Sequence, residues 1–175
     1  TLIVSSSSNQ EAAILVQSLF NGTCIRPYTN GDTIGVELCG ALKNVIALAC
    51  GIATGLGYGD NTRAAIITRG MAEIQNLGHA MGCLDETFSG LAGMGDLIVT
   101  ATSHHSRNNR AGMLIGKGRK PQEAIEEIGM VVEGINALPA AIELSKRYSV
   151  GLPIISAVDD IVNHTAGKRK KRQGA

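Results

Sequence analysis

The sequence predicts a mainly α-helical protein, a multi-helix bundle that follows a short strand–helix–strand unit. From residue 33 onward, apolar residues recur at helical spacing, and the alternation typical of strands almost disappears. Residues 1–30 instead contain two short strand-like runs on either side of one helical stretch, which is typical of an α/β sheet. With 175 residues, the chain is long enough to bury a substantial core.

The first strand is predicted over residues 1–4, and a helix follows over residues 9–20. A second strand is predicted over residues 24–29. Two strands alone do not make a stable sheet, and the chain does not begin with Met. We therefore expect residues 1–31 to be the last piece of an α/β domain whose earlier part precedes residue 1.

A long helix is predicted over residues 33–54, and it is apolar on nearly every side, so we expect it at the centre of the bundle. Gly40 and Gly51 interrupt it, and close packing is the expected reason because glycine costs about 1 kcal/mol within a helix. The glycines of residues 55–59 do not form a dinucleotide fingerprint, which follows a strand and opens a helix. They predict a loop between helices.

Further helices are predicted where polar or proline-containing breaks separate apolar stripes. These helices cover residues 62–81, 85–89, 95–102, 107–116, 121–128, 133–148 and 153–163. Together with the long helix they predict a helical domain over residues 32–164. Residues 165–175 carry a run of five basic side chains, and we expect a solvated, frayed tail there rather than an RNA, membrane or targeting signal.

Composition excludes several classes of function. The net charge of +1 gives no general bias toward nucleic acid, and no uninterrupted apolar run approaches the roughly 20 residues that cross a bilayer. None of the four cysteines forms a CxxC pair, and Cys39 and Cys50 lie in apolar helical contexts. We therefore expect reduced thiols and a cytoplasmic protein. His104 and His105 are adjacent and would face different ways, which disfavours a metal site.

Lys43 lies between apolar residues of the long predicted helix. It is either a side chain that reaches out to solvent along the helix, or a partly desolvated amine whose pKa is lowered toward neutrality and which acts as a general base. Asn44 beside it would then hold a hydroxyl group of a substrate or of a ribose.

Asp96 follows a Gly-rich stretch, where a carboxylate caps a helix or points at a lysine or substrate hydroxyl. Residues 100–110 are a polar interruption in which Ser106 is the expected N-cap of the next helix. The free N–H groups at such a position bind anions, and Arg107 adds a guanidinium fork for phosphate or carboxylate. The alternative is a solvated polar loop.

Val131 and Glu133 stand just before and at the start of a later predicted helix. The carboxylate of Glu133 either interacts with the helix N-terminus or accepts hydrogen bonds from ribose hydroxyls. The residues themselves leave both interpretations open.

Four segments together resemble the bacterial-type NAD(P)-dependent glycerol-3-phosphate dehydrogenase family, in the same order and at the same spacing, within a similarity that runs from about residue 1 to residue 163. They read GVELCGALKNVIA at residues 35–47, NTRAAIITRG at 61–70, LAGMGDL at 91–97 and TSHHSRN at 102–108.

The resemblance implies an enzyme that interconverts dihydroxyacetone phosphate and sn-glycerol 3-phosphate with NAD or NADP and supplies glycerophospholipid synthesis. It implies an N-terminal Rossmann domain, of which residues 1–31 would be the remnant, and a helical domain over residues 32–164 of the 6-phosphogluconate dehydrogenase C-terminal type. The chain lacks the family's glycine fingerprint, so it is expected to be inactive alone. Independently of the resemblance, the broad apolar helices favour a homodimer, and no membrane span is expected.

The resemblance also assigns roles to individual residues. Lys43 matches the family's proton acceptor, and Arg107 matches a residue that touches both substrate and cofactor. The other implied substrate contacts are Asn44, Asp96, Ser106 and Asn108, and the other implied cofactor contacts are Val131 and Glu133.

Two alternatives are weighed against this enzyme. Related hydroxyacid dehydrogenases place an Asn four residues after their lysine, where this chain has Ala47. A non-catalytic helical module for oligomerisation or anion binding would instead leave Lys43 with structural contacts only, pointing away from any cleft.

Overall fold

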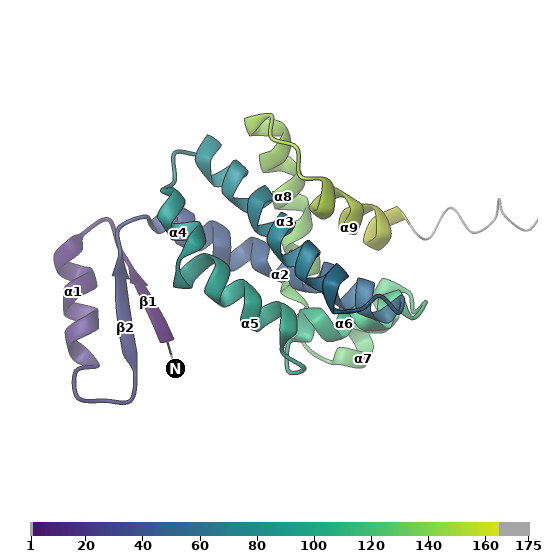
Figure 1. The fold of residues 1–175 in the computed structure, drawn as a ribbon, viewed down its shortest axis with the longest axis horizontal. Helices are drawn as coiled ribbons and strands as arrows, with labels where there is room; N and C mark the ends of the chain where they lie inside the picture. The colour runs from purple at the N-terminus through teal and green to yellow at the C-terminus, as the bar shows by residue number, and fades with distance from the viewer. Residues whose placement is uncertain (1, 165–175) are drawn as a thin grey trace, which may run out of the picture.

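The computed structural model describes residues 2–164, with side chains described for residues 7–163. The predicted basic tail, residues 165–175, lies outside the described residues. Figure 1 shows a small strand–helix–strand unit beside a larger body of helices. The mainly helical fold predicted from the sequence is confirmed.

The strand–helix–strand unit consists of β1 (Leu2–Ser6), α1 (Gln10–Leu19) and β2 (Arg26–Asn30). Its two strands are parallel, and the pairing runs from Leu2 opposite Arg26 to Ser6 opposite Asn30. The parallel pairing through one helix is the arrangement expected of a β-α-β unit.

The helical body contains the remaining elements. They are α2 (Thr33–Gly55), α3 (Asp60–Ala80), α4 (Asp85–Ser89), the π-helical turn η1 (Leu91–Gly95), α5 (Asp96–Thr102), α6 (Arg107–Gly116), α7 (Pro121–Ile128), α8 (Glu133–Tyr148) and α9 (Pro153–His164). Each predicted helix is present, and its ends lie within two residues of the prediction.

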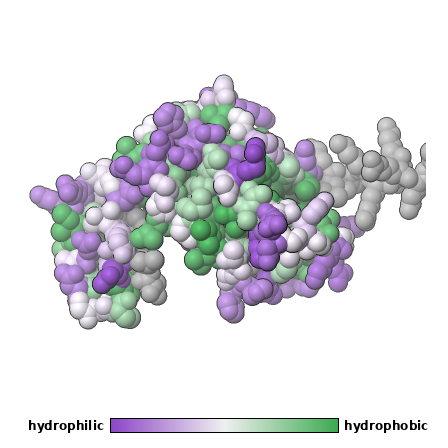
Figure 2. Space-filling model, in the orientation of Figure 1, coloured by the Kyte–Doolittle hydropathy of each residue, from purple (hydrophilic) through white to green (hydrophobic). Residues whose placement is uncertain are grey.

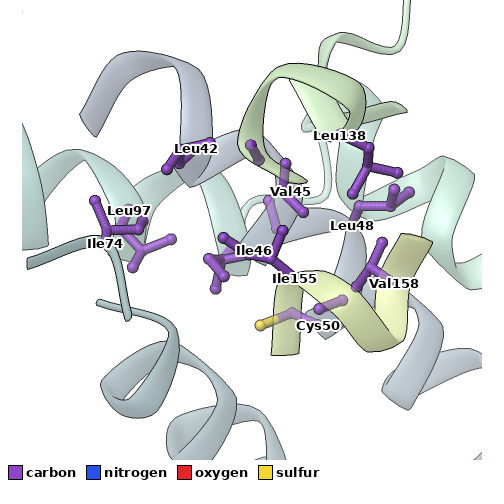
Figure 3. Close-up of a cluster of buried hydrophobic side chains, with 14 of the residues drawn as sticks. Leu42, Val45, Ile46, Leu48, Cys50, Ile74, Leu97, Leu138, Ile155 and Val158 are labelled. Carbon is purple, nitrogen blue, oxygen red and sulfur yellow. The ribbon is translucent and has the colours of Figure 1, made fainter. Parts of the chain in front are cut away.

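Helix α2 lies in the middle of this body and contacts α3, α5, α6, α8 and α9. Figure 3 shows its apolar side chains packed among those of its neighbours. Val45, Ile46 and Leu48 of α2 are inaccessible to solvent, as is Leu138 of α8. The prediction that this helix is central is confirmed.

Within residues 2–164, α2 is the one helix whose length and hydropathy would suffice to span a membrane. The sequence-based expectation considered only unbroken apolar runs and did not single it out. Of its most apolar window, 72% is buried against other helices. Such burial is expected of the core helix of a bundle, because the neighbouring helices take the place of lipid.

Asp32 fixes the start of α2. Its carboxylate accepts hydrogen bonds from the N–H groups of Gly35 and Leu84, each at 2.9 Å. Burial opposes ionisation of Asp32, but the hydrogen bonds from Leu84, Gly35 and Thr87 outweigh it and lower its pKa. The carboxylate therefore ties α2 to the segment that precedes α4.

Gly40 and Gly51, two of the four glycines of α2, have different surroundings. A Cβ atom on Gly51 would lie 2.0 Å from the carbonyl oxygen of Asn109, where the α2 and α6 backbones approach closely at Gly112. The predicted close packing is therefore found at Gly51. It is wrong for Gly40, where a Cβ atom would meet nothing within 4 Å.

Glu73 of α3 is a buried carboxylate that the sequence analysis did not single out. It accepts hydrogen bonds from the N–H groups of Ile154 at 2.7 Å and Ile155 at 3.2 Å, and so satisfies the first turn of α9. Burial raises the pKa of Glu73, although these two amides and the charge of Arg69 partly offset the rise.

The glycines give a stability test. Gly51→Ala is expected to destabilise the fold by about 1–3 kcal/mol, because the added methyl group separates α2 from α6. Gly40→Ala is expected to be neutral or to stabilise by up to about 1 kcal/mol, since the site is open and alanine favours a helix. Urea unfolding followed by circular dichroism measures both. Equal effects of the two changes would contradict the packing described here.

Glu73 gives a pH test. The pKa of Glu73 is higher in the folded state than its ordinary value of about 4.5. Protonated Glu73 therefore stabilises the fold fully at pH values below about 4.5, and this contribution is lost as the pH rises through the folded-state pKa. The stability of the wild type minus that of Glu73→Gln should therefore fall over that window. Urea unfolding of both proteins across pH 4–7 measures the difference, and a difference that grows with pH would contradict the raised pKa.

Candidate functional site

Lys43 and Asp96 form an ion pair between α2 and the first residue of α5. Their side chains are 20% and 42% exposed, so the pair lies at the edge of the core and not inside it. The N-cap of α5 is Gly95, and Asp96 is the acidic residue of its first turn. The carboxylate of Asp96 points at a lysine, which is one of the two compatible roles that its position at the helix start predicts.

The π-helical turn η1 directs Asp96 toward α2. The sequence predicted helix from residue 95 but not this turn. A Cβ atom on Gly93 would lie 2.1 Å from the carbonyl oxygen of Phe88, so the turn requires glycine there. Thr100, one helical turn after Asp96, donates a 2.7 Å hydrogen bond to its carbonyl oxygen, and its hydroxyl lies 3.4 Å from Asp96 Oδ1.

An open cleft of about 490 Å³ lies beside this pair. Its lining residues are Val36, Gly40, Leu91, Ala92, Gly95, Asp96 and Val99. The walls are apolar apart from Asp96, and of the predicted site residues only Asp96 lines the cleft. Figure 2 shows hydrophobic residues at the surface over α5, which carries the exposed side chains of Ile98 and Val99. Gly40 lines the cleft, and a Cβ atom there would meet nothing within 4 Å.

Asn44 is buried and points into a polar cluster between α2, α6 and α8. Its Nδ2 donates to the carbonyl oxygen of Gly40 at 3.0 Å and to Oε2 of Glu133 at 3.1 Å. Its Oδ1 accepts a 2.9 Å hydrogen bond from Nδ2 of Asn108. The hydrogen-bonding atoms of this predicted substrate contact are thus engaged within the protein.

Asn108 is also buried, and its Oδ1 accepts a 2.8 Å hydrogen bond from the N–H group of Gly134. Gly134 permits the contact, since a Cβ atom there would lie 2.5 Å from the carbonyl oxygen of Asn44. The sequence analysis missed Gly134, and a glycine in the first turn of a helix was the only signal that pointed to it.

Ser106 is the N-cap of α6, as predicted, and its hydroxyl oxygen accepts a hydrogen bond from the N–H group of Asn109 at 3.3 Å. Asn109, which the sequence analysis also missed, is buried, and its Nδ2 donates a 2.9 Å hydrogen bond to the carbonyl oxygen of Ala101. This bond anchors the polar segment before α6, so that segment is not merely a solvated loop.

Arg107 and Glu133 begin α6 and α8, and Nη2 of Arg107 donates a 3.1 Å hydrogen bond to Oε1 of Glu133. Their side chains are 35% and 52% exposed. The N-cap of α8 is Val132, and Glu133 is the acidic residue in the first turn of the helix. Val131 is exposed just before α8.

The group at the starts of α6 and α8 has the chemistry that a phosphorylated, hydroxyl-bearing ligand needs. The guanidinium of Arg107 matches a phosphate, and the carboxylate of Glu133 accepts hydrogen bonds from hydroxyl groups. Val131 adds an exposed apolar surface. These residues therefore fit part of a nicotinamide dinucleotide. Among residues 2–164, no cluster of His, Cys, Asp and Glu could hold a metal ion.

Comparison with known proteins gives a consistent result. The family model described as NAD-dependent glycerol-3-phosphate dehydrogenase C-terminus matches residues 32–170. The match runs past residue 163, where the resemblance was expected to end.

Two curated relatives match nearly the whole chain. A glycerol-3-phosphate dehydrogenase (NAD(P)+) 2 of Lactobacillus delbrueckii subsp. bulgaricus is 62% identical over 170 residues, which is 97% of this chain and 50% of that protein. A glycerol-3-phosphate dehydrogenase (NAD(P)+) of Bacillus subtilis is 57% identical over 162 residues, covering 93% and 47%. The chain spans about half the length of these relatives.

A solved structure also matches. The glycerol-3-phosphate dehydrogenase of Coxiella burnetii superposes with a TM-score of 0.90 at 38% identity, over 94% of this chain and 50% of that one. The family model covers more than half of the chain, and this chain has the same fold as the matching half of that dehydrogenase. The chain therefore belongs to the family of NAD-dependent glycerol-3-phosphate dehydrogenase C-terminal domains.

Proposed function

We propose that this chain is the substrate-binding and catalytic part of an oxidoreductase that interconverts sn-glycerol 3-phosphate and dihydroxyacetone phosphate with NAD or NADP. The observation that carries the proposal is the Lys43–Asp96 ion pair beside an open cleft, linked through Asn44 to Arg107 and Glu133. The relatives that match the chain carry this activity in their names.

The nicotinamide cofactor, when bound, supplies the hydride for reduction and accepts it in oxidation. The protein must supply and remove the proton on the reacting oxygen of the substrate. In reduction, the ammonium group of Lys43 gives a proton to the oxygen of the carbonyl group as that oxygen gains charge. In oxidation, the neutral amine takes the proton back from the hydroxyl group. Asp96 holds the amine in position through the ion pair.

The substrate's phosphate gives the enzyme a point of attachment away from the reacting carbon. Arg107 offers a charged fork at the N-terminus of α6, where unpaired N–H groups also favour an anion. Ser106 lies at the same helix start and supplies a hydroxyl donor. Fixing the phosphate there would hold the carbonyl carbon and its oxygen in one orientation. Asn108 would act from the interior, by placing Asn44.

The two alternatives are less well supported. Ala47 is 0% exposed, so the position four residues after Lys43 offers no polar side chain to a ligand, unlike the hydroxyacid dehydrogenases. A purely structural module predicts that Lys43 points away from any cleft, whereas its partner Asp96 lines the cleft wall.

The proposal also covers the domain organisation, the cellular compartment and the oligomeric state of the protein. Residues 1–31 would be the end of an N-terminal Rossmann domain, and residues 32–164 the helical domain. All four cysteines are free, and burial raises the pKa of Cys39 and of Cys50 to about 12, which suits a reducing cytoplasm. A homodimer stays a prediction, which sedimentation of the full-length protein would test.

Lys43→Met tests the proton transfer. In the full-length protein, turnover with dihydroxyacetone phosphate is expected to fall by about 10²–10⁴-fold, because the replacement cannot exchange a proton. Steady-state kinetics measures the loss, and circular dichroism checks the fold. Lys117→Met, the same change at an exposed lysine, is the matched control. Turnover of the Lys43 variant close to that of the control would remove Lys43 from the mechanism.

Arg107→Ala tests the phosphate site. The loss of a charged hydrogen bond of about 1.5–3 kcal/mol is expected to raise KM for dihydroxyacetone phosphate by on the order of 10²-fold. KM for the unphosphorylated ketone dihydroxyacetone should change much less. Arg119→Ala, at an exposed arginine of another ion pair, serves as the control. An unchanged KM for the phosphorylated ketone would place its phosphate elsewhere.

A further inference from the structure

The buried amides between α2, α6 and α8 form a hydrogen-bonded chain with only one satisfactory direction. At one end the N–H group of Gly134 can only donate, so Asn108 must present its oxygen to it. At the other end the carbonyl oxygen of Gly40 can only accept, so Asn44 must present its nitrogen. Asn108 is then left with its Nδ2 and Asn44 with its Oδ1, so the hydrogen bond between them must run from Asn108 to Asn44. The two atoms are 2.9 Å apart.

This fixed direction aims a second N–H of the Asn44 amide at Glu133. Oε2 of Glu133 accepts from Asn44 at 3.1 Å, and Oε1 accepts from Arg107 at 3.1 Å. Both oxygens must therefore accept, which a carboxylate does and an amide cannot. Glu133 is the one side chain among the described residues that bonds to both Asn44 and Arg107.

We infer that Glu133 is a positioning residue that orients the guanidinium of Arg107 for the phosphate of the substrate. This inference rests on the proposed function and adds a role to the cofactor contact implied for Glu133 by resemblance. Arg107 is partly exposed and has many rotamers, so an unheld guanidinium would lose entropy when it binds an anion. The bond to Glu133 uses one N–H group and leaves the others for the ligand.

The buried amide chain holds the carboxylate of Glu133 in one position. An exposed carboxylate–arginine pair alone orders its partner weakly. Here the second carboxylate oxygen is held by a buried amide whose own orientation is set by two backbone groups. Supported in this way, the carboxylate can hold a mobile arginine in one place.

A double-mutant cycle in the full-length protein tests the inference. Glu133→Gln should raise KM for dihydroxyacetone phosphate, and Kd for glycerol 3-phosphate by calorimetry, roughly two- to fivefold. When Arg107 is already alanine, adding Glu133→Gln should raise them no further, because its effect passes through Arg107. The matched control is Glu127→Gln with Arg119→Ala, a second exposed pair of the same residue types. No control variant should change either constant.

The outcomes separate the inference from the proposed function. The inference is wrong if the increases in KM and Kd caused by the Glu133 and Arg107 changes multiply in the double variant. It is also wrong if Glu133→Gln weakens only the binding of the cofactor. In both cases Glu133 does not act through Arg107. If the wild-type protein binds glycerol 3-phosphate but does not oxidise it, the proposed reaction fails, and the binding cycle still decides the role of Glu133.

Discussion

Burial of α2 on nearly every side is the constraint on which the rest of the structure depends. A helix in that position can carry polar side chains only where partners for them are built into the surrounding helices, because an unpaired buried polar group costs several kcal/mol. Lys43 forms an ion pair with Asp96. Asn44 forms hydrogen bonds with Asn108, with Glu133 and with the carbonyl oxygen of Gly40. Among the described residues, no buried side-chain nitrogen or oxygen lacks a hydrogen-bond partner.

Lys43 and Asn44 are consecutive in the chain, yet they belong to two different parts of the candidate site. Consecutive residues on a helix point about 100° apart, so they meet different neighbouring helices. Lys43 contacts α5 at the cleft, whereas Asn44 contacts α6 and α8 at the charged edge that contains Arg107. One short stretch of a rigid core helix therefore connects the expected place of proton transfer with the expected place of phosphate binding.

Periodicity, helix caps and loop residues predicted most of the fold, because those signals are local. Ser106 as the cap of α6 and the central position of α2 followed from them. Gly40 and Gly51 could not be told apart, since their difference depends on which helix packs against each face. The role of Glu73 at α9 was equally hidden, because its partners lie about 80 residues further along the chain.

The same limit explains which site residues were understood only in part. A resemblance assigns Asn44, Asn108 and Glu133 to ligands one by one, but a sequence does not show what they do to one another. In the structure, the two asparagines use their hydrogen-bonding groups within the protein, whereas the side chains of Lys43, Ser106 and Arg107 are partly exposed. The buried amides are then best understood as the framework that fixes the exposed charges. A change at Asn108 is therefore expected to disturb Asn44 and, through Glu133, the orientation of Arg107.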